Sequence, residues 1–283
     1  MAGAELDYVL PAADLQPYVT LFYRFHSPAP IHDEVERAQQ AQLRFRLSPG
    51  AGAYHMHDGT QQGAAAIHLL GPTTCPTRAR AEGPLLVFGM GVTPAGWSAL
   101  LGSDASTMLN RVVDATTLFG DQLLETAVAL RNASDAAAMA AAAEPLLRRL
   151  VGSGRKGEWA PTLTFVRMVD EWLAGSPSPA LGALLTETGL SRRQVERRCN
   201  ALYGAPPKLL ARKYRALRAA VTMASGGEEI EGFYDQSHMI REVKQFTGLT
   251  PRRMREAPGA LTKLTIAHRR ALEGQVHRII SDT

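Results

Sequence analysis

Two segments in the C-terminal half of the chain repeat one pattern at an offset of 44 residues. The positions that fall into register are Val195 with Met239, Arg197 with Arg241, Cys199 with Val243, Gly204 with Gly248, and Pro207 with Pro251. A repeat that keeps apolar and turn residues together indicates two copies of one supersecondary unit. The apolar spacing between Gly204 and Ala220 predicts a long helix that joins the two units.

Each copy contains a second helix whose start and buried face can be predicted. In the first copy, residues 179–187 have the pattern of a short helix, Gly189 suits a left-handed turn, and Ser191 can cap the helix that follows. Asp235 is the corresponding cap in the second copy. Apolar residues at i, i+4 and i+7 bury one stripe of each capped helix and turn its polar residues outward. These stripes are Val195, Cys199 and Leu202, and Met239, Val243 and Phe246.

Positive charge is concentrated in the same half of the chain. The net charge is +4 overall, −3 for residues 1–159 and +7 for residues 160–283. Between Ser191 and Arg218 there are nine basic residues and one acidic residue. The positive charges of this segment repel one another unless a polyanion neutralises them. Charge alone therefore leaves nucleic acid, a membrane surface and an acidic protein as candidate partners.

The segments 189–198 (Gly-Leu-Ser-Arg-Arg-Gln-Val-Glu-Arg-Arg) and 232–251 (Gly-Phe-Tyr-Asp-Gln-Ser-His-Met-Ile-Arg-Glu-Val-Lys-Gln-Phe-Thr-Gly-Leu-Thr-Pro) resemble the DNA-binding domain of the AraC/XylS family of bacterial regulators. The resemblance extends over about residues 160–256. It implies a seven-helix module in which two helix-turn-helix units, joined by a linker helix, place recognition helices in successive major grooves of double-stranded DNA.

The resemblance also implies which side chains read DNA bases. Arginine recognises guanine and glutamine recognises adenine through paired hydrogen bonds in the major groove. The implied base-reading residues are Arg193, Glu196, Arg197, Gln236, Ser237, His238 and Arg241. To these we add predicted phosphate contacts by Arg192, Arg198, Lys213 and Lys244.

The second unit departs from the pattern of the family. Members of the family carry a full helix before the turn at Gly232, whereas this chain has only Glu228–Glu231 there. Four residues make about one helical turn, which is too short to support a recognition helix in the usual way. Cys199 and Val243 are small where the family usually has phenylalanine, which predicts a looser core. One alternative is therefore a sensory or protein-interaction module that has lost normal DNA binding.

The N-terminal half has a different character. Short apolar runs between glycines and prolines predict a small β-rich unit, a β-barrel or a sandwich, over residues 1–93. Helical spacing follows over residues 94–151, including a helix over 105–113. We expect an α+β protein with a linker at 152–159, the DNA-binding domain at 160–257 and a helical tail at 258–283. The tail is expected to pack on its own domain or on a partner chain.

The N-terminal half also resembles, more weakly, the sensory half of some members of the same family. The segments concerned are 21–26, 68–73, 92–102 and 111–114. This resemblance implies a cupin-like barrel followed by helices that bind a small-molecule effector or form a homodimer. The effector-binding residues are unknown at this point. The function expected is that of a ligand-responsive transcription regulator, with RNA polymerase as a further partner.

Other functions have less support in the sequence. None of the GxSxG, HExxH or P-loop motifs is present, so we expect no enzyme and no cofactor. His55 and His57, with His68 or His26 as a third ligand, leave a cupin-type metalloprotein as a second alternative, although we expect no metal. Cys75 would be a redox sensor if it were exposed near a cation such as Arg78, but a structural thiol is expected.

The chain shows no signs of export or membrane insertion. It begins without a basic region followed by an apolar run, and no uncharged apolar stretch reaches 18 residues. Its two cysteines cannot build a disulfide framework. We therefore expect a cytoplasmic protein that does not associate with membranes.

Overall fold

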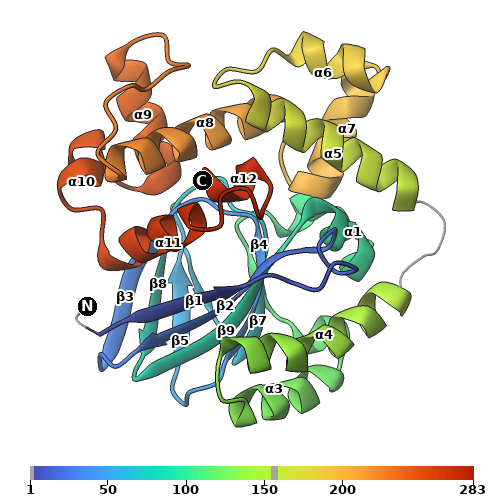
Figure 1. The fold of residues 1–283 in the computed structure, drawn as a ribbon, viewed down its shortest axis with the longest axis vertical. Coiled ribbons are helices and arrows are strands. Elements are labelled where there is room, and N and C mark those ends of the chain that lie inside the picture. Colours follow the sequence, from blue (N-terminus) through green and yellow to red (C-terminus); the bar gives the residue numbers. More distant parts are fainter. Residues whose placement is uncertain (1–2, 154–158) are drawn as a thin grey trace.

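Ten strands form two antiparallel sheets in the N-terminal half of the chain (Figure 1). The computed structural model describes residues 3–153 and 159–283, so most of the predicted linker lies outside the described residues. The strands are β1 (Glu5–Val9), β2 (Val19–Ser27), β3 (Ile31–Glu36), β4 (Ala41–Arg46), β5 (Gly52–His55), β6 (Gln61–Gly63), β7 (Ile67–Leu70), β8 (Thr77–Glu82), β9 (Leu85–Val92) and β10 (Val112–Asp114).

The strand pairings separate these strands into a six-stranded and a four-stranded sheet. Their orders are β1-β2-β9-β4-β7-β10 and β3-β8-β5-β6. The prediction of a β-rich unit followed by helices is confirmed. The pairings close no barrel within the described residues, and the two sheets form the sandwich that is the other expected arrangement.

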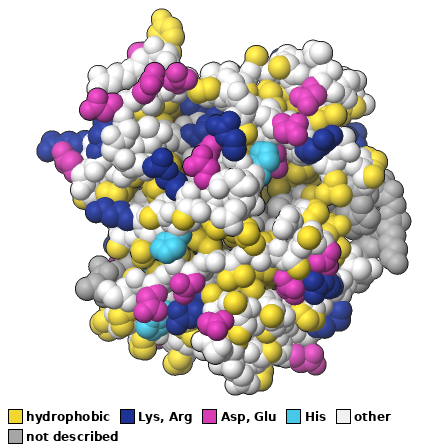
Figure 2. Space-filling view, viewed as in Figure 1, with side chains coloured by type: hydrophobic (Ala, Val, Ile, Leu, Met, Phe, Trp, Pro, Cys, Tyr) yellow, Lys and Arg dark blue, Asp and Glu magenta, His cyan; other side chains and the backbone are white. Residues whose placement is uncertain are grey.

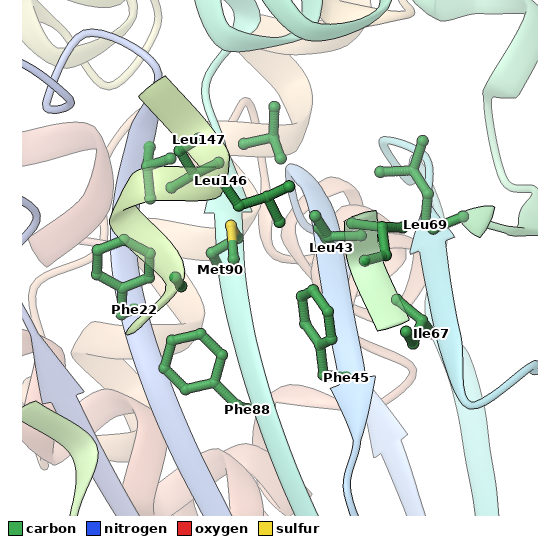
Figure 3. Close-up of a cluster of buried hydrophobic side chains, with 14 of the residues drawn as sticks. Phe22, Leu43, Phe45, Ile67, Leu69, Phe88, Met90, Leu146 and Leu147 are labelled. Carbon is green, nitrogen blue, oxygen red and sulfur yellow. The ribbon is translucent and has the colours of Figure 1, made fainter. Parts of the chain in front are cut away.

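Strand β4 shows how alternation in the sequence orients the larger sheet. Side chains of successive residues point to opposite faces of a strand. Leu43 and Phe45 therefore enter a helix-covered core, while Arg44 and Arg46 line a cavity on the other face. Figure 3 shows this core, whose other labelled side chains are Phe22, Ile67, Leu69, Phe88, Met90, Leu146 and Leu147. Burial of each large apolar side chain contributes roughly 1.5–3 kcal/mol.

The helices that cover this core are α1 (Pro94–Leu101), α2 (Thr116–Phe119), α3 (Gln122–Asn132) and α4 (Ala136–Ser153). The predicted helix over 105–113 is wrong. A 3-10 helix, η1 (Ala105–Met108), is followed by strand β10 instead. Asn110 adopts a left-handed conformation (φ 56°), which ends helical geometry. Val112 then pairs with Leu70 of β7, where a β-branched residue packs well.

The C-terminal half is helical and lies above the sheets in Figure 1. Its helices are α5 (Trp159–Gly175), α6 (Leu181–Thr188), α7 (Arg192–Tyr203), α8 (Pro207–Ala224), α9 (Gln236–Thr247), α10 (Pro251–Glu256), α11 (Ala260–Arg270) and α12 (Arg278–Ser281). The predicted helical tail is two helices, α11 and α12, separated by a turn region that contains Gly274 in a left-handed conformation (φ 81°). The tail packs on its own chain, against β1, β3, α5 and α8.

The second repeat lacks its first helix. Residues 225–235 contain no helix, so Glu228–Glu231 do not form the missing element. The expected seven-helix module thus has six helices, α5 to α10. The four residues 228–231 are too few for helical hydrogen bonds to offset the free-energy cost of helix nucleation. No helix in the described parts of the chain has the length and apolar character needed to cross a bilayer.

Candidate DNA-binding surface and ligand cavity

Helix α7 begins at a complete capping box. Ser191 Oγ accepts a hydrogen bond from the backbone N–H of Gln194 (3.4 Å), and Gln194 Oε1 accepts one from the N–H of Ser191 (2.9 Å). Gly189, at φ 64°, ends α6 two residues earlier. Val195 and Cys199 are completely buried. Capping and burial together set the direction of α7 and turn its polar face outward.

The predicted site residues of α7 lie on this outward face. Arg193 and Arg197 are exposed. Glu196 accepts a hydrogen bond from Arg192 (3.0 Å) in an exposed ion pair. An exposed pair of this kind contributes at most about 1 kcal/mol, so either partner can rearrange to meet DNA. The Arg198 guanidinium stacks on the Phe165 ring (5.1 Å to the centroid), which ties this side chain to α5.

Helix α9 is capped in the same way. Asp235 Oδ1 accepts a hydrogen bond from the backbone N–H of His238 (2.7 Å). The exposed residues on its outward face are Gln236, Ser237, Arg241 and Lys244. His238 is half-buried, and its Nε2 lies 3.2 Å from Glu242 Oε1. Most of the predicted base-reading side chains of α9, which we call its reading face, are therefore exposed to solvent. His238 is the exception, because it also contacts the buried Glu242.

A buried carboxylate fastens α9 to α8. Glu242 is 1% exposed and accepts hydrogen bonds from Arg212 (2.7 Å) and from Arg215 (2.7 and 3.0 Å). Burial alone would raise the pKa of Glu242, but the hydrogen bonds from the two arginines outweigh it and hold that pKa below its usual value. No sequence pattern predicts this network, because its partners lie 27 and 30 residues apart. It supports α9 where the repeat lacks a helix.

Two grooves border the reading faces. One runs between the start of α7 and α9 across α8, with Arg192, Lys208 and Arg241 among its lining residues. The other places Asp104 and Ser106 of the N-terminal half beside Arg193 and Arg197 of α7. In the face shown in Figure 2, basic side chains alternate with acidic ones over the upper helices. The carboxylate of Asp104, from the N-terminal half, therefore lies at the edge of the outward face of α7.

A cavity of about 160 Å³ lies between the two sheets, α8 and the C-terminal tail. A single water needs only about 10–15 Å³ of such space, so the cavity has room for a small organic molecule. Its walls are largely apolar, with Leu6, Phe25, Leu85, Val87, Leu217 and Leu261 among them. A Cβ at Gly89 would collide with the Tyr23 ring, so this glycine lets Tyr23 lie across β9 inside the cavity.

Five arginines line this space: Arg37, Arg44, Arg46, Arg80 and Arg269. Arg44 donates to both oxygens of Glu36 (2.8 and 2.9 Å) and to Tyr54 Oη (2.7 Å). Arg44 Nε, and one or two guanidinium nitrogens each of Arg37, Arg46 and Arg269, are buried without a hydrogen-bond partner in the described structure. Burial lowers the pKa of Arg37 to about 9, and nearby Arg269 contributes in the same direction. Unsatisfied cations of this kind attract an acidic group.

Residues 184–257 match the protein family described as Helix-turn-helix domain. The C-terminal half contains an AraC-type helix-turn-helix domain. None of the curated proteins matches the chain.

The chain is also similar to solved structures of other proteins, among them the following three. ToxT from Vibrio cholerae is 10% identical (TM-score 0.42), with 81% of this chain and 99% of that chain covered. Wild-type ToxT with bound unsaturated fatty acid is 10% identical (TM-score 0.43), with 81% and 93% covered. The AraC-like transcriptional activator CuxR is 11% identical (TM-score 0.31), with 70% and 80% covered. All three TM-scores lie below 0.5, where similarity alone does not establish a shared fold.

Lys213, one of the residues predicted to contact phosphate, does not lie on the outward surface of the helices. Lys213 is 3% exposed, and its Nζ donates a hydrogen bond to the backbone oxygen of Gln39 (2.7 Å). Burial lowers the pKa of Lys213 to about 7. It cannot reach a phosphate in this conformation, because it lies on the face of α8 that packs on the N-terminal half. Lys213 is a contact between domains.

The histidines considered as metal ligands and the cysteine considered as a redox sensor form no such site in the described structure. Among the described residues, no cluster of three or more His, Cys, Asp or Glu side chains could hold a metal ion. His68 is buried, contacts Tyr54 Oη (3.0 Å), and has a pKa lowered to about 4 by burial. Burial raises the pKa of the Cys75 thiol, and Arg78 is paired with Asp33 instead. These surroundings favour a structural thiol over a redox sensor.

Proposed function

We propose that this protein is a ligand-responsive regulator of transcription that recognises a DNA sequence through α7 and α9. The observation that carries this proposal is the pair of capped helices at the two ends of α8, each with exposed polar side chains on its N-terminal half. Such a helix suits the major groove, where its first turns reach the base edges.

The proposed contacts follow the exposed faces. Base contacts are assigned to Arg193, Glu196, Arg197, Gln236, Ser237, His238 and Arg241, and phosphate contacts to Arg192, Arg198 and Lys244. We expect α7 to contribute more than α9, because a complete helix, α6, precedes α7. The alternative, a module that has lost DNA binding, predicts weak binding without sequence preference.

A selection from random duplex DNA tests the proposal. The full chain should recover a preferred sequence and bind it with a steep dependence on salt, since phosphate contacts release counterions. The double variant Arg193→Ala/Arg197→Ala should lose the preference and at least tenfold in affinity, because each bidentate base contact contributes roughly 1–3 kcal/mol. Arg111→Ala/Arg149→Ala removes the same charge from exposed sites in the N-terminal half and should keep the preference. Equal behaviour of the two variants would reject sequence reading by α7.

We also propose that the cavity binds the effector and that the effector is a small molecule with an acidic group on an apolar body. Apolar walls, and buried guanidinium nitrogens of Arg37, Arg46 and Arg269 that have no hydrogen-bond partner in the described structure, support this ligand chemistry. Helix α8 links the cavity to the DNA-binding helices. Lys213, Tyr214 and Leu217 line the cavity, while Arg212 and Arg215 hold Glu242 of α9. Helix α8 therefore carries both cavity-lining residues and the residues that bind Glu242 of α9.

A homodimer is part of the proposal. Leu124 and Val128 lie four residues apart on α3, where they are 50% and 55% exposed, and Leu118 on α2 is 48% exposed. An apolar patch of this kind supports self-association. Sedimentation of the variant Leu124→Glu/Val128→Glu checks it: a monomer is expected where the unaltered chain is a dimer. Contact with RNA polymerase stays a prediction from the family resemblance.

A further inference from the structure

The C-terminal segment, residues 260–283, forms one wall of the cavity. Helix α11 contributes Leu261, Thr262, Thr265 and Arg269 to the lining, and the region of α12 contributes Ile279, Ile280 and Thr283. Helix α11 packs on β1, β3 and α8, and α12 packs on α5. Figure 1 shows the segment between the sheets below and the DNA-binding helices above. It therefore touches both halves of the molecule at the cavity.

Thr283 occupies the position between two of the cavity arginines. Its main-chain oxygen accepts hydrogen bonds from Arg37 Nη2 (3.2 Å) and Arg269 Nη1 (2.8 Å). Its hydroxyl donates to the backbone oxygen of Ile279 (2.6 Å), and the residue is 6% exposed. Residues 278–283 thus fold back on themselves and place one oxygen at the cationic end of the cavity.

This oxygen satisfies the two guanidinium groups only in part. Arg37 Nη1 and Arg269 Nε remain buried without a partner in the described structure. The carboxylate of an acidic ligand would form paired hydrogen bonds with these guanidinium groups and would bring its negative charge next to the oxygen of Thr283. An acidic ligand would therefore compete with Thr283 for the same two side chains.

Residues 278–283 are joined to α11 by turns and not by a continuous helix. Helix α12 has only four residues, and residues 271–277, which join it to α11, form turns around Gly274. The main apolar anchor is Ile279, which is 3% exposed and belongs to the same core as Phe165 and Tyr214. Release of residues 278–283 would uncover the cavity and expose part of the core of the DNA-binding domain.

We propose that residues 278–283 are the gate of the cavity, and that the acidic group of the effector and Thr283 exclude each other at Arg37 and Arg269. This inference rests on the proposed function, in that the cavity takes an acidic effector. Ligand binding then affects the DNA-binding domain, because release of residues 278–283 removes the contact between α12 and α5.

Hydrogen exchange of the backbone amides in residues 278–283 measures the gate directly. Octanoate serves as the acidic probe, and octanol, of equal length without charge, is its control. Octanoate should raise exchange in this segment at least threefold, and octanol should not. The variant Arg37→Gln/Arg269→Gln should raise exchange without any ligand, because Thr283 loses both donors. Arg46→Gln, which alters a cavity arginine away from Thr283, should leave exchange unchanged.

Calorimetry of octanoate binding separates the gate from the proposed function. Ile279→Asp should release the segment and tighten octanoate binding at least threefold, because a closed gate lowers the competent fraction. A chain without residues 278–283 replaces this variant if it does not fold. Octanoate binding with unchanged exchange in residues 278–283 would overturn the gate and leave the effector site intact. Absence of binding to the unaltered chain and to both released forms would reject the acidic effector, and the gate with it.

Discussion

Glu242 is the residue through which α9 is held to α8. Removal of one partner from a buried ion pair leaves charges without compensation and destabilises a protein strongly. Glu242→Gln should therefore lower the free energy of unfolding by on the order of 3 kcal/mol, measured by urea denaturation. Glu256→Gln breaks an exposed pair with Arg252 and should change it little. Similar small losses in both variants would mean that the network does not secure α9.

Lys213 gives a second prediction at the scale of a residue. Its pKa falls to about 7 in the folded protein from 10.5. Between these values the unfolded chain binds more protons, so stability rises with pH in this window. Lys213→Met should remove this rise, whereas Lys208→Met, at an exposed position on the same helix, should retain it. Denaturation at pH 7 and pH 9 tests this, and identical pH dependence in the two variants would contradict it.

Helices α7 and α9 differ in their support, and this difference should appear in DNA recognition. Helix α7 follows α6, whereas α9 follows residues 225–235, which form no helix. A recognition helix that is held less firmly contributes less to sequence preference, because ordering it has a cost in entropy. Gln236→Ala/Arg241→Ala should therefore weaken binding less than Arg193→Ala/Arg197→Ala in the same selection. An equal or larger loss would show that α9 reads DNA as strongly as α7.

At the scale of the whole molecule, the N-terminal half borders the first reading face. Asp104 shares a groove with Arg193 and Arg197, where its carboxylate repels DNA phosphates. Asp104→Asn should tighten DNA binding about two- to fivefold at low salt, and the gain should disappear at high salt as screening shortens the range of charge.

Asp114→Asn is the matched control for this prediction. Asp104 and Asp114 each accept a hydrogen bond from the backbone N–H two residues later (2.9 Å in both cases), but Asp114 lies outside the groove. Its substitution should leave DNA affinity unchanged. Equal gains from both variants would assign the effect to net charge and not to the position of Asp104.

The sequence alone predicted what depends on local spacing. The repeat at 44 residues, the caps at Ser191 and Asp235, and the buried stripes predicted the helices of the DNA-binding domain, because turn geometry and helical periodicity are local properties. The alternation in residues 41–46 likewise follows from the strand itself. The sequence predicts that the N-terminal half is rich in β-strands, but it does not predict how these strands pair into two sheets.

Only the tertiary structure decided which side of each element meets another part of the chain. Lys213 faces the N-terminal half and not DNA, Glu242 collects two arginines of α8, and Thr283 meets Arg37 across 246 residues. A basic residue has the same local pattern whether it faces a phosphate, a carboxylate or a backbone oxygen. Its role is set by long-range packing, because burial and the partner then available determine whether its charge is exposed, neutralised or left to bind a ligand.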